Sequence, residues 1–182
     1  ARLANNLDSL ERNNLLRAVT GIGQGELLAS PLSIALMFSA VVNEGDMPEP
    51  HLLKSVRSPS GAVLQKEPQA IWSRNIMSTQ TARQARQMMI ALVERGSQAA
   101  VPGLTVGGKT GTAEVADNKA PHAWFAGFAE NEERTVVIAV LVENGGQGGS
   151  VATPIFARVA DAALNHYGEP VEEVIVPPGA RE

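Results

Sequence analysis

Three strand-like segments follow one another between residues 105 and 142, and their order constrains the fold more than any other feature of the sequence. The first surrounds Lys109, the second covers residues 122–128, and the third, residues 134–142, is apolar almost throughout. A polar loop and a short polar turn connect them. Consecutive strands joined in this way pair antiparallel, because a parallel pair needs a longer crossover. The sequence therefore predicts an antiparallel sheet flanked by helices, in the mixed α/β (α+β) class.

Two helices are predicted before this sheet. Ser30-Pro31 combines an N-cap serine with proline at the first helical position, and Gly45 ends that helix. Ser78 caps the second helix, which ends at Gly96. Apolar residues at helical spacing should face the core. These are Ile34, Met37, Phe38, Val41 and Val42 in the first helix, and Ala82, Ala85, Met88, Met89, Leu92 and Val93 in the second.

A third helix is predicted after the sheet. Residues 145–149 are glycine-rich and predict a flexible loop, after which Thr153-Pro154 repeats the cap-and-proline start. The helix should stop by Gly168, and the proline-rich tail of residues 169–182 is expected to be extended or disordered. Its inward face should consist of Ile155, Phe156, Val159, Ala162 and Ala163.

The remaining segments are shorter. Residues 1–20 have leucines at approximately helical spacing and predict a short helix and a loop. Residues 21–25, Gly-Ile-Gly-Gln-Gly, are interpreted as a flexible entry to the next helix, because Glu26 stands where a dinucleotide fingerprint requires glycine. Residues 51–57 and 62–65, separated by Ser-Pro-Ser-Gly, predict a hairpin.

Composition excludes several classes of function. The chain has 182 residues, 44% of them hydrophobic, and a net charge of −4, which fits one globular domain or a large part of one and offers no basic surface for nucleic acid. There is no cysteine, and His51, His122 and His166 are too scattered to predict a metal site. No apolar run approaches the roughly 20 residues that span a bilayer. Without an initiator methionine or a signal-peptide pattern at Ala1, we expect the chain to be part of a longer protein.

Residues 103–114, Gly-Leu-Thr-Val-Gly-Gly-Lys-Thr-Gly-Thr-Ala-Glu, predict a binding edge. Three glycines remove side chains next to the main chain, as a ligand lying against a strand requires. One cation and two hydroxyls suit a carboxylate or phosphate ligand. The glycines are Gly107, Gly108 and Gly111, and the polar residues are Lys109, Thr110 and Thr112.

One interpretation of this stretch is a phosphate-binding loop, since residues 103–110 satisfy the pattern G-x-x-x-x-G-K-[ST]. That motif requires a buried strand before it and a helix that opens at Lys-Thr. Here residues 97–102 are loop-like, and residues 111–121 cannot open a good helix. A phosphate-loop nucleotide binder is therefore the alternative from a different functional class.

A second interpretation treats Lys109-Thr110-Gly111 as the K-T-G motif of the serine penicillin-recognising enzymes, which lies on the edge strand of an antiparallel sheet. Other segments support it and keep the order of that family. They are Gly21-Ile-Gly-Gln-Gly25, Ser30-Pro-Leu with a helix ending in Asn43-Glu-Gly45, Gly107 to Glu114, His122-Ala-Trp-Phe-Ala-Gly-Phe128, and Gly148-Gly-Ser-Val-Ala-Thr-Pro-Ile-Phe156. From about Gly21 to Tyr167 the chain resembles the penicillin-binding transpeptidases, especially the high-molecular-weight class B type.

The resemblance implies roles for the residues of the motif. Lys109 would help to set the electrostatics of the site and orient protons near the nucleophile. The hydroxyls of Thr110 and Thr112 would bind the carboxylate of a D-Ala-D-Ala peptide or of a β-lactam. Gly111 would let the substrate lie against the strand, and the Thr112 N–H would be an oxyanion-hole donor, which typically contributes about 3 kcal/mol. The alternative is that Lys109 is a solvated strand lysine.

The sequence departs from the family at the nucleophile. The family serine stands in Ser-x-x-Lys, and no serine here has lysine three places later. The second family motif, Ser-x-Asn, matches only Ser73-Arg-Asn75, which follows the Gly-x-Gly-Gln region instead of preceding it. We therefore interpret Ser73 and Asn75 as a chance match, and we expect both missing motifs to lie upstream of Ala1.

By this resemblance, the parent protein is a serine-type D,D-transpeptidase that cross-links peptidoglycan, residues 1–168 are the C-terminal part of its domain, and this chain alone is inactive. The expected partners are the D-Ala-D-Ala stem peptide, β-lactams, the missing N-terminal half of the domain and other cell-wall synthesis proteins, with no cofactor, metal or nucleic acid. The expected location is the extracytoplasmic face of the cell membrane, with the anchor outside this chain. A β-lactam sensor domain and a β-lactamase share the fold and remain alternatives.

Overall fold

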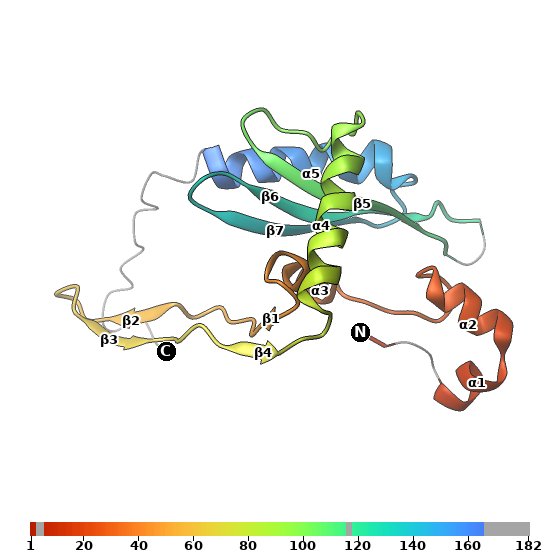
Figure 1. The fold of residues 1–182 in the computed structure, drawn as a ribbon, viewed down its shortest axis with the longest axis horizontal. Helices are drawn as coiled ribbons and strands as arrows, with labels where there is room; N and C mark the ends of the chain where they lie inside the picture. Colours follow the sequence, from red (N-terminus) through yellow and green to blue (C-terminus); the bar gives the residue numbers. More distant parts are fainter. Residues whose placement is uncertain (3–5, 116–117, 166–182) are drawn as a thin grey trace, which may run out of the picture.

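The computed structural model describes residues 1–2, 6–115 and 118–165 (Figure 1). The predicted tail of residues 169–182 and the predicted helix end at Gly168 lie outside them. The elements are α1 (Leu7–Arg12), α2 (Asn14–Gly21), α3 (Pro31–Val42), β1 (Met47–Pro48), β2 (Ser55–Arg57), β3 (Val63–Lys66), β4 (Ile71–Ser73), α4 (Thr79–Glu94), β5 (Thr105–Ala113), β6 (His122–Glu130), β7 (Thr135–Val142) and α5 (Gly148–Asn165). The predicted class, an antiparallel sheet with flanking helices, is confirmed.

The main sheet has three strands in the order β5-β6-β7, and both pairs are antiparallel, as predicted. Its β6–β7 turn is closed by Asn131, whose side-chain oxygen accepts hydrogen bonds from the backbone N–H groups of Glu133 (3.0 Å) and Arg134 (2.9 Å). Asparagine favours such turns because its side chain can replace a backbone acceptor. β6 pairs with both β5 and β7 and is therefore the central strand.

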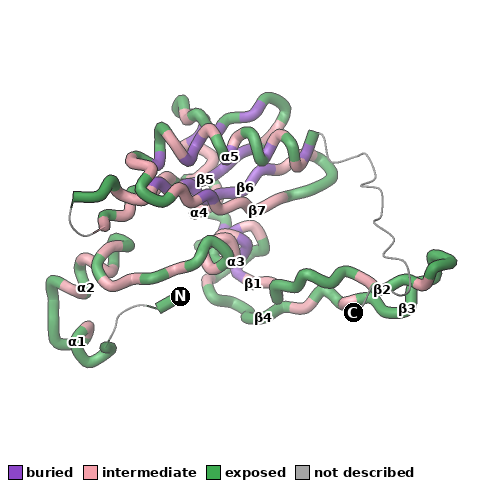
Figure 2. Tube along the Cα trace, turned by 180° about the vertical axis from the view of Figure 1, so that it is seen from behind, coloured by how far each residue is buried: buried purple, intermediate pink, exposed green. Residues whose placement is uncertain are grey.

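Helices cover both faces of this sheet, with α5 along one face and α3 and α4 on the other (Figures 1 and 2). On the α5 side, the ring of Phe125 in β6 packs against Phe156, with ring centroids 4.6 Å apart. Phe128 lies three residues after Phe125 in β6, so its ring points to the opposite face of the sheet, toward α4. There the Arg86 guanidinium lies 5.3 Å from its ring centroid. Because both faces are covered, β6 is buried along almost its whole length.

The two predicted helix starts before the sheet are confirmed. Ser30 Oγ accepts from the Ser33 N–H, and Ser78 Oγ accepts from the Thr81 N–H, each at 3.1 Å. Two methionines predicted to face inward do not: the exposed fractions are 53% for Met37 and 70% for Met88. The apolar stripe of each helix is wider than its buried face. That face consists of Ser39, Ala40 and Val41 in α3 and of Ala82 and Val93 in α4.

The last helix differs from the prediction in its start and in its inward face. It begins at Gly148, so the glycine loop is shorter than expected and Thr153-Pro154 lies inside the helix. Thr153 Oγ1 donates to the Gly148 carbonyl at 3.0 Å, a buried contact within the helix. Ile155 and Val159 face outward, because the sheet contacts the opposite stripe, which consists of Gly148, Ala152, Thr153, Phe156, Ala160 and Leu164. Apolar residues on both sides made the inward face ambiguous.

Two peripheral segments extend away from the sheet (Figure 1). The predicted hairpin is confirmed as β2–β3, and with the β1–β4 pair it forms a ribbon. Residues 1–20 contain two short helices where one was predicted, because Asn13 begins a second: its side-chain oxygen accepts from the Leu16 N–H at 3.0 Å.

Candidate active site

β5 carries all four predicted site residues and is an edge strand. In the described chain it pairs only with β6, in a register that aligns Lys109 with Ala126 and Thr112 with Ala123. The Thr112 carbonyl accepts a hydrogen bond from a side chain outside the sheet. Since the N–H and C=O of one strand residue point to the same side, the Thr112 N–H also faces the open edge, as do the backbone groups of Thr110 two residues before it.

The polar side chains of the motif gather along this edge. Lys109 is exposed, and its Nζ donates to the Thr110 carbonyl at 3.1 Å and lies 3.4 Å from Thr110 Oγ1. Thr112 Oγ1 accepts from the Gly148 N–H, at the first residue of α5, at 3.4 Å. A cation, two hydroxyls and outward-facing backbone N–H groups therefore lie within one short length of strand, which suits an extended ligand with a carboxylate.

Two glycines of the motif, Gly107 and Gly108, have a different role from the one predicted. Gly107 and Gly108 are buried, and a Cβ at either would overlap a ring of β6: it would lie 2.7 Å from Cε1 of Phe128 at Gly107 and 2.6 Å from Cε1 of Phe125 at Gly108. These two glycines make room for the core and not for a ligand. Gly111 is half-buried, and its missing side chain faces Trp124 Cβ at 3.1 Å.

The backbone contradicts the phosphate-loop alternative. A phosphate loop needs a helix that opens at its Lys-Thr pair, so that the helix N-terminus faces the phosphate. Here Lys109 and Thr110 lie in the middle of a continuous strand from Thr105 to Ala113, and the next helix in the described chain begins at Gly148.

Gln24 is a residue at this edge that the sequence interpretation missed. Its Nε2 donates to the Thr112 carbonyl at 2.9 Å, and its Oε1 accepts from the Glu114 N–H at 3.3 Å. The segment was interpreted only as a flexible entry to a helix. The available signal was a glutamine between two glycines, a pattern that holds one side chain in a tight turn.

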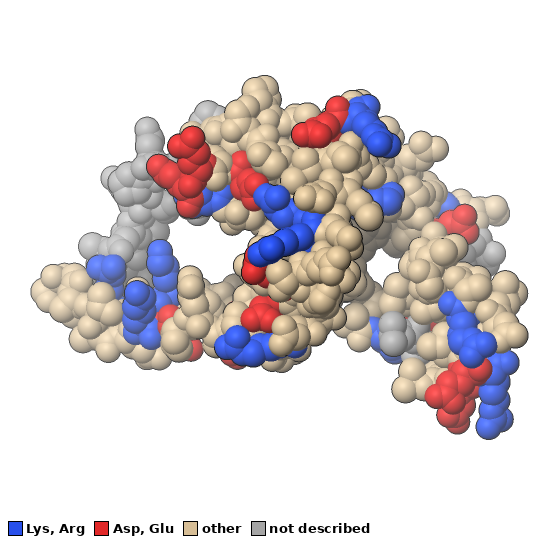
Figure 3. All heavy atoms as spheres, viewed as in Figure 1, with Lys and Arg blue, Asp and Glu red and all other residues tan. Residues whose placement is uncertain are grey.

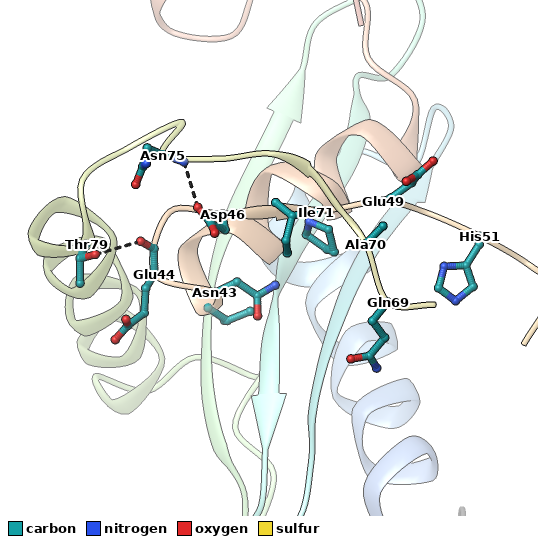
Figure 4. Close-up of a pocket in the computed structure, with 12 residues that line it drawn as sticks. Asn43, Glu44, Asp46, Glu49, His51, Gln69, Ala70, Ile71, Asn75 and Thr79 are labelled. Atoms are coloured by element: carbon teal, nitrogen blue, oxygen red, sulfur yellow. Dashed lines mark hydrogen bonds between the residues drawn. The ribbon is translucent and has the colours of Figure 1, made fainter. Parts of the chain in front are cut away.

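Ser73 and Asn75 lie away from this edge. Ser73 ends β4, and the Asn75 N–H donates to Asp46 Oδ1 at 2.9 Å, beside the start of α4 (Figure 4). Asn75 borders a polar hollow of about 730 Å³ between the end of α3 and the base of the ribbon, and the lining of this hollow includes no β5 residue. Two of its carboxylates pair with arginines, Glu44 with Arg83 and Asp46 with Arg74. Figure 3 likewise shows acidic and basic groups side by side around α4.

Similarity to known proteins identifies the family of this chain. The family model described as "Penicillin binding protein transpeptidase domain" matches residues 3–161. This chain belongs to the penicillin-binding protein transpeptidase family. Among curated relatives, it is 34% identical over 161 residues to the peptidoglycan D,D-transpeptidase PbpA of Mycobacterium tuberculosis, a match that covers 84% of this chain and 32% of the relative. It is 33% identical to the peptidoglycan D,D-transpeptidase MrdA of Haemophilus influenzae, covering 86% of this chain and 27% of that protein.

Solved structures of the family share the fold. The ceftriaxone acyl-enzyme complex of penicillin-binding protein A from M. tuberculosis superposes with a TM-score of 0.77 at 32% identity, covering 84% of this chain and 36% of that one. The D,D-transpeptidase domain of a peptidoglycan glycosyltransferase from Eggerthella lenta gives a TM-score of 0.73 at 28% identity, covering 88% and 41%. The chain thus spans about a third of the length of the relatives that it matches.

The described part of the chain contains neither a membrane-spanning helix nor a cluster of metal-binding side chains. Within residues 1–2, 6–115 and 118–165, no helix combines the length and the hydropathy needed to cross a bilayer. The same residues contain no group of three or more His, Cys, Asp or Glu side chains arranged to hold a metal ion.

Proposed function

We propose that this chain forms one wall of the active site of a serine D,D-transpeptidase that cross-links peptidoglycan stem peptides. The observation that carries the proposal is the open edge of β5, which presents Lys109, Thr110 and Thr112 beside outward-facing backbone groups in a chain of this family. The names of the PbpA and MrdA relatives favour transpeptidation over a β-lactam sensor or a β-lactamase.

In this proposal each residue of the edge would have its own role. An extended D-Ala-D-Ala peptide or a β-lactam would lie along β5 and pair with its backbone, and Gly111 leaves that approach free of a side chain. The hydroxyls of Thr110 and Thr112 and the charge of Lys109 would bind the substrate carboxylate. The Thr112 N–H, which faces the open edge, would donate to the oxyanion that develops during acylation. Lys109 would also orient protons near the nucleophile.

The nucleophile must come from outside this chain, because no Ser-x-x-Lys is present. Its serine oxygen would form an ester with the carbonyl of the penultimate D-Ala while the terminal D-Ala leaves, and an amino group of a second stem would then take the acyl group. The chain would thus be the C-terminal part of a longer protein, acting at the extracytoplasmic face of the cell membrane with its anchor elsewhere.

Intact-mass spectrometry with penicillin tests this function. Two proteins are compared, this 182-residue chain and the longer product of the same reading frame. We expect the longer protein to gain the mass of penicillin on a serine of a Ser-x-x-Lys motif, and the short chain to stay unmodified. A longer protein that lacks that motif, or that is never acylated, would refute the proposal.

A further inference from the structure

The Gly-Ile-Gly-Gln-Gly segment is the one sequence motif to which the proposed function gives no role. The structure shows a tight turn between α2 and α3 that is anchored on the end of α2, where the backbone N–H of Gln24 donates to the Val19 carbonyl at 3.0 Å. Gly23 (φ +81°) and Gly25 (φ +75°) flank Gln24 in the left-handed region that favours glycine. The two glycines therefore let the chain turn sharply on both sides of one half-buried glutamine.

The turn directs the Gln24 amide to the open edge of β5. One primary amide supplies a donor to the Thr112 carbonyl and an acceptor to the Glu114 N–H, at 2.9 and 3.3 Å. These are the positions at which a further strand would bind, so the side chain replaces one residue of a neighbouring strand. Gln24 precedes Thr112 by 88 positions and Glu114 by 90 positions in the sequence.

We infer that Gln24 is a positioning residue for the oxyanion donor, an inference that rests on the proposed function. Three contacts hold Thr112 in place. β5, which carries Thr112, pairs with β6 on one side. The Gly148 N–H donates to the Thr112 hydroxyl at 3.4 Å, and the Gln24 amide donates to the Thr112 carbonyl. Because Gln24 occupies the Thr112 carbonyl and the Glu114 N–H, a ligand strand cannot pair with β5 beyond Thr112. The same contacts keep Thr112 in the extended conformation, in which its N–H points away from β6.

Such a residue acts on the transition state and not on ground-state binding. An oxyanion donor must lie within about 0.5 Å of its productive place, and small misplacements cost up to about 100-fold in rate. Removing Gln24 releases the Thr112–Glu114 segment while leaving the hydroxyls of Thr110 and Thr112 in place. The acylation rate constant should therefore fall, and the dissociation constant of the initial β-lactam complex should change little.

The contact itself is tested first, in this chain, by amide hydrogen exchange. In Gln24→Ala the Glu114 N–H should lose protection, while the amides that join β5 to β6 keep theirs. Gln84→Ala, an exposed glutamine on α4, is the matched control and should change neither. Unchanged protection of Glu114 in Gln24→Ala would overturn the inference, whatever the activity of the longer protein.

The positioning role is tested in the longer protein by stopped-flow acylation with a fluorescent penicillin. Gln24→Ala should lower the acylation rate constant by about 10- to 100-fold with little change in the dissociation constant. Gln24→Glu keeps the acceptor but loses the donor, and its rate relative to wild type should rise as pH falls toward about 4.3, where a protonated carboxyl can donate to Thr112.

The outcomes separate the two proposals. A Gln24→Ala rate equal to or above that of wild type, or a loss confined to the dissociation constant, would overturn the positioning role and leave the proposed function standing. If the wild-type longer protein is not acylated at all, the proposed function fails, and the exchange experiment still decides whether the Gln24 contact exists.

Discussion

Replacing Gly148 with alanine would force α5 away from the strand that carries the candidate site. A Cβ at this position would overlap the carbonyl oxygens of Gly111 and Trp124 and lie 3.1 Å from the Gly111 N. These are backbone atoms of paired strands, so they cannot rotate out of the way as a side chain can. Gly149 offers a matched control, because a Cβ there would meet only Thr110 Cγ2 at 3.9 Å, an ordinary contact.

The comparison of the two variants isolates the steric cost. Both substitutions place alanine where glycine stood in the first turn of the same helix, so both gain a similar helix propensity of at most about 1 kcal/mol. Only Gly148→Ala adds atoms to a closely packed contact, and overpacking of this kind costs about 1–3 kcal/mol. The free energy of unfolding of Gly148→Ala should therefore lie about 1–3 kcal/mol below that of Gly149→Ala.

Urea unfolding followed by tryptophan fluorescence measures this difference, since Trp124 lies in the sheet beside the contact. The midpoint should fall for Gly148→Ala with no change in the slope of free energy against urea concentration. In the longer protein, the same variant should also slow acylation, because it displaces the strand that holds Thr112. Equal midpoints for the two variants would refute the tight seating of α5 on β5.

Three further predictions concern the core, an ion pair and the site. Phe156→Ala should lower the free energy of unfolding by about 3–5 kcal/mol, measured in urea, because its ring is fully buried between α5 and the sheet. Arg86→Ala removes both the ion pair with Glu130 and the contact with an aromatic ring of β6, and should cost about 1–2 kcal/mol, against less than about 1 kcal/mol for the more exposed Arg83→Ala; equal losses would contradict this reasoning. Lys109→Ala should slow penicillin acylation of the longer protein by about 10²–10⁴-fold while leaving the unfolding of this chain within about 0.5 kcal/mol, and an unchanged rate would argue for a merely solvated lysine.

The sheet and most helix starts could be predicted because local signals determined them. The strand segments are separated by polar turns, and Ser30 and Ser78 cap their helices as expected. The inward face of α5 could not be predicted in the same way. Ile155 and Val159 are as apolar as the buried residues, and only the partner surface decides which side is covered.

The candidate site could be predicted only in part, because a local pattern identifies residues that lie close together in the sequence. Lys109, Thr110 and Thr112 are adjacent in the sequence, so a single motif could identify them. Gln24 reaches the same edge from 88 residues before Thr112, and no local pattern states which backbone groups a side chain in a turn will meet. Gly108 was interpreted as a binding glycine because the ring that fills its place, Phe125, belongs to another strand.

A ligand on the open edge of β5 would be bound in two ways, by the backbone of the strand and by its side chains. Backbone pairing is the same for every extended peptide, so it can hold a ligand without reading its sequence. Under the proposed function, discrimination between ligands would come from the few side chains along the edge, chiefly Lys109, Thr110 and Thr112. Because β6 and α5 hold the strand from behind, these side chains can be exchanged without rebuilding the sheet. The ligand preference of such an edge can therefore change faster in evolution than the fold that carries it.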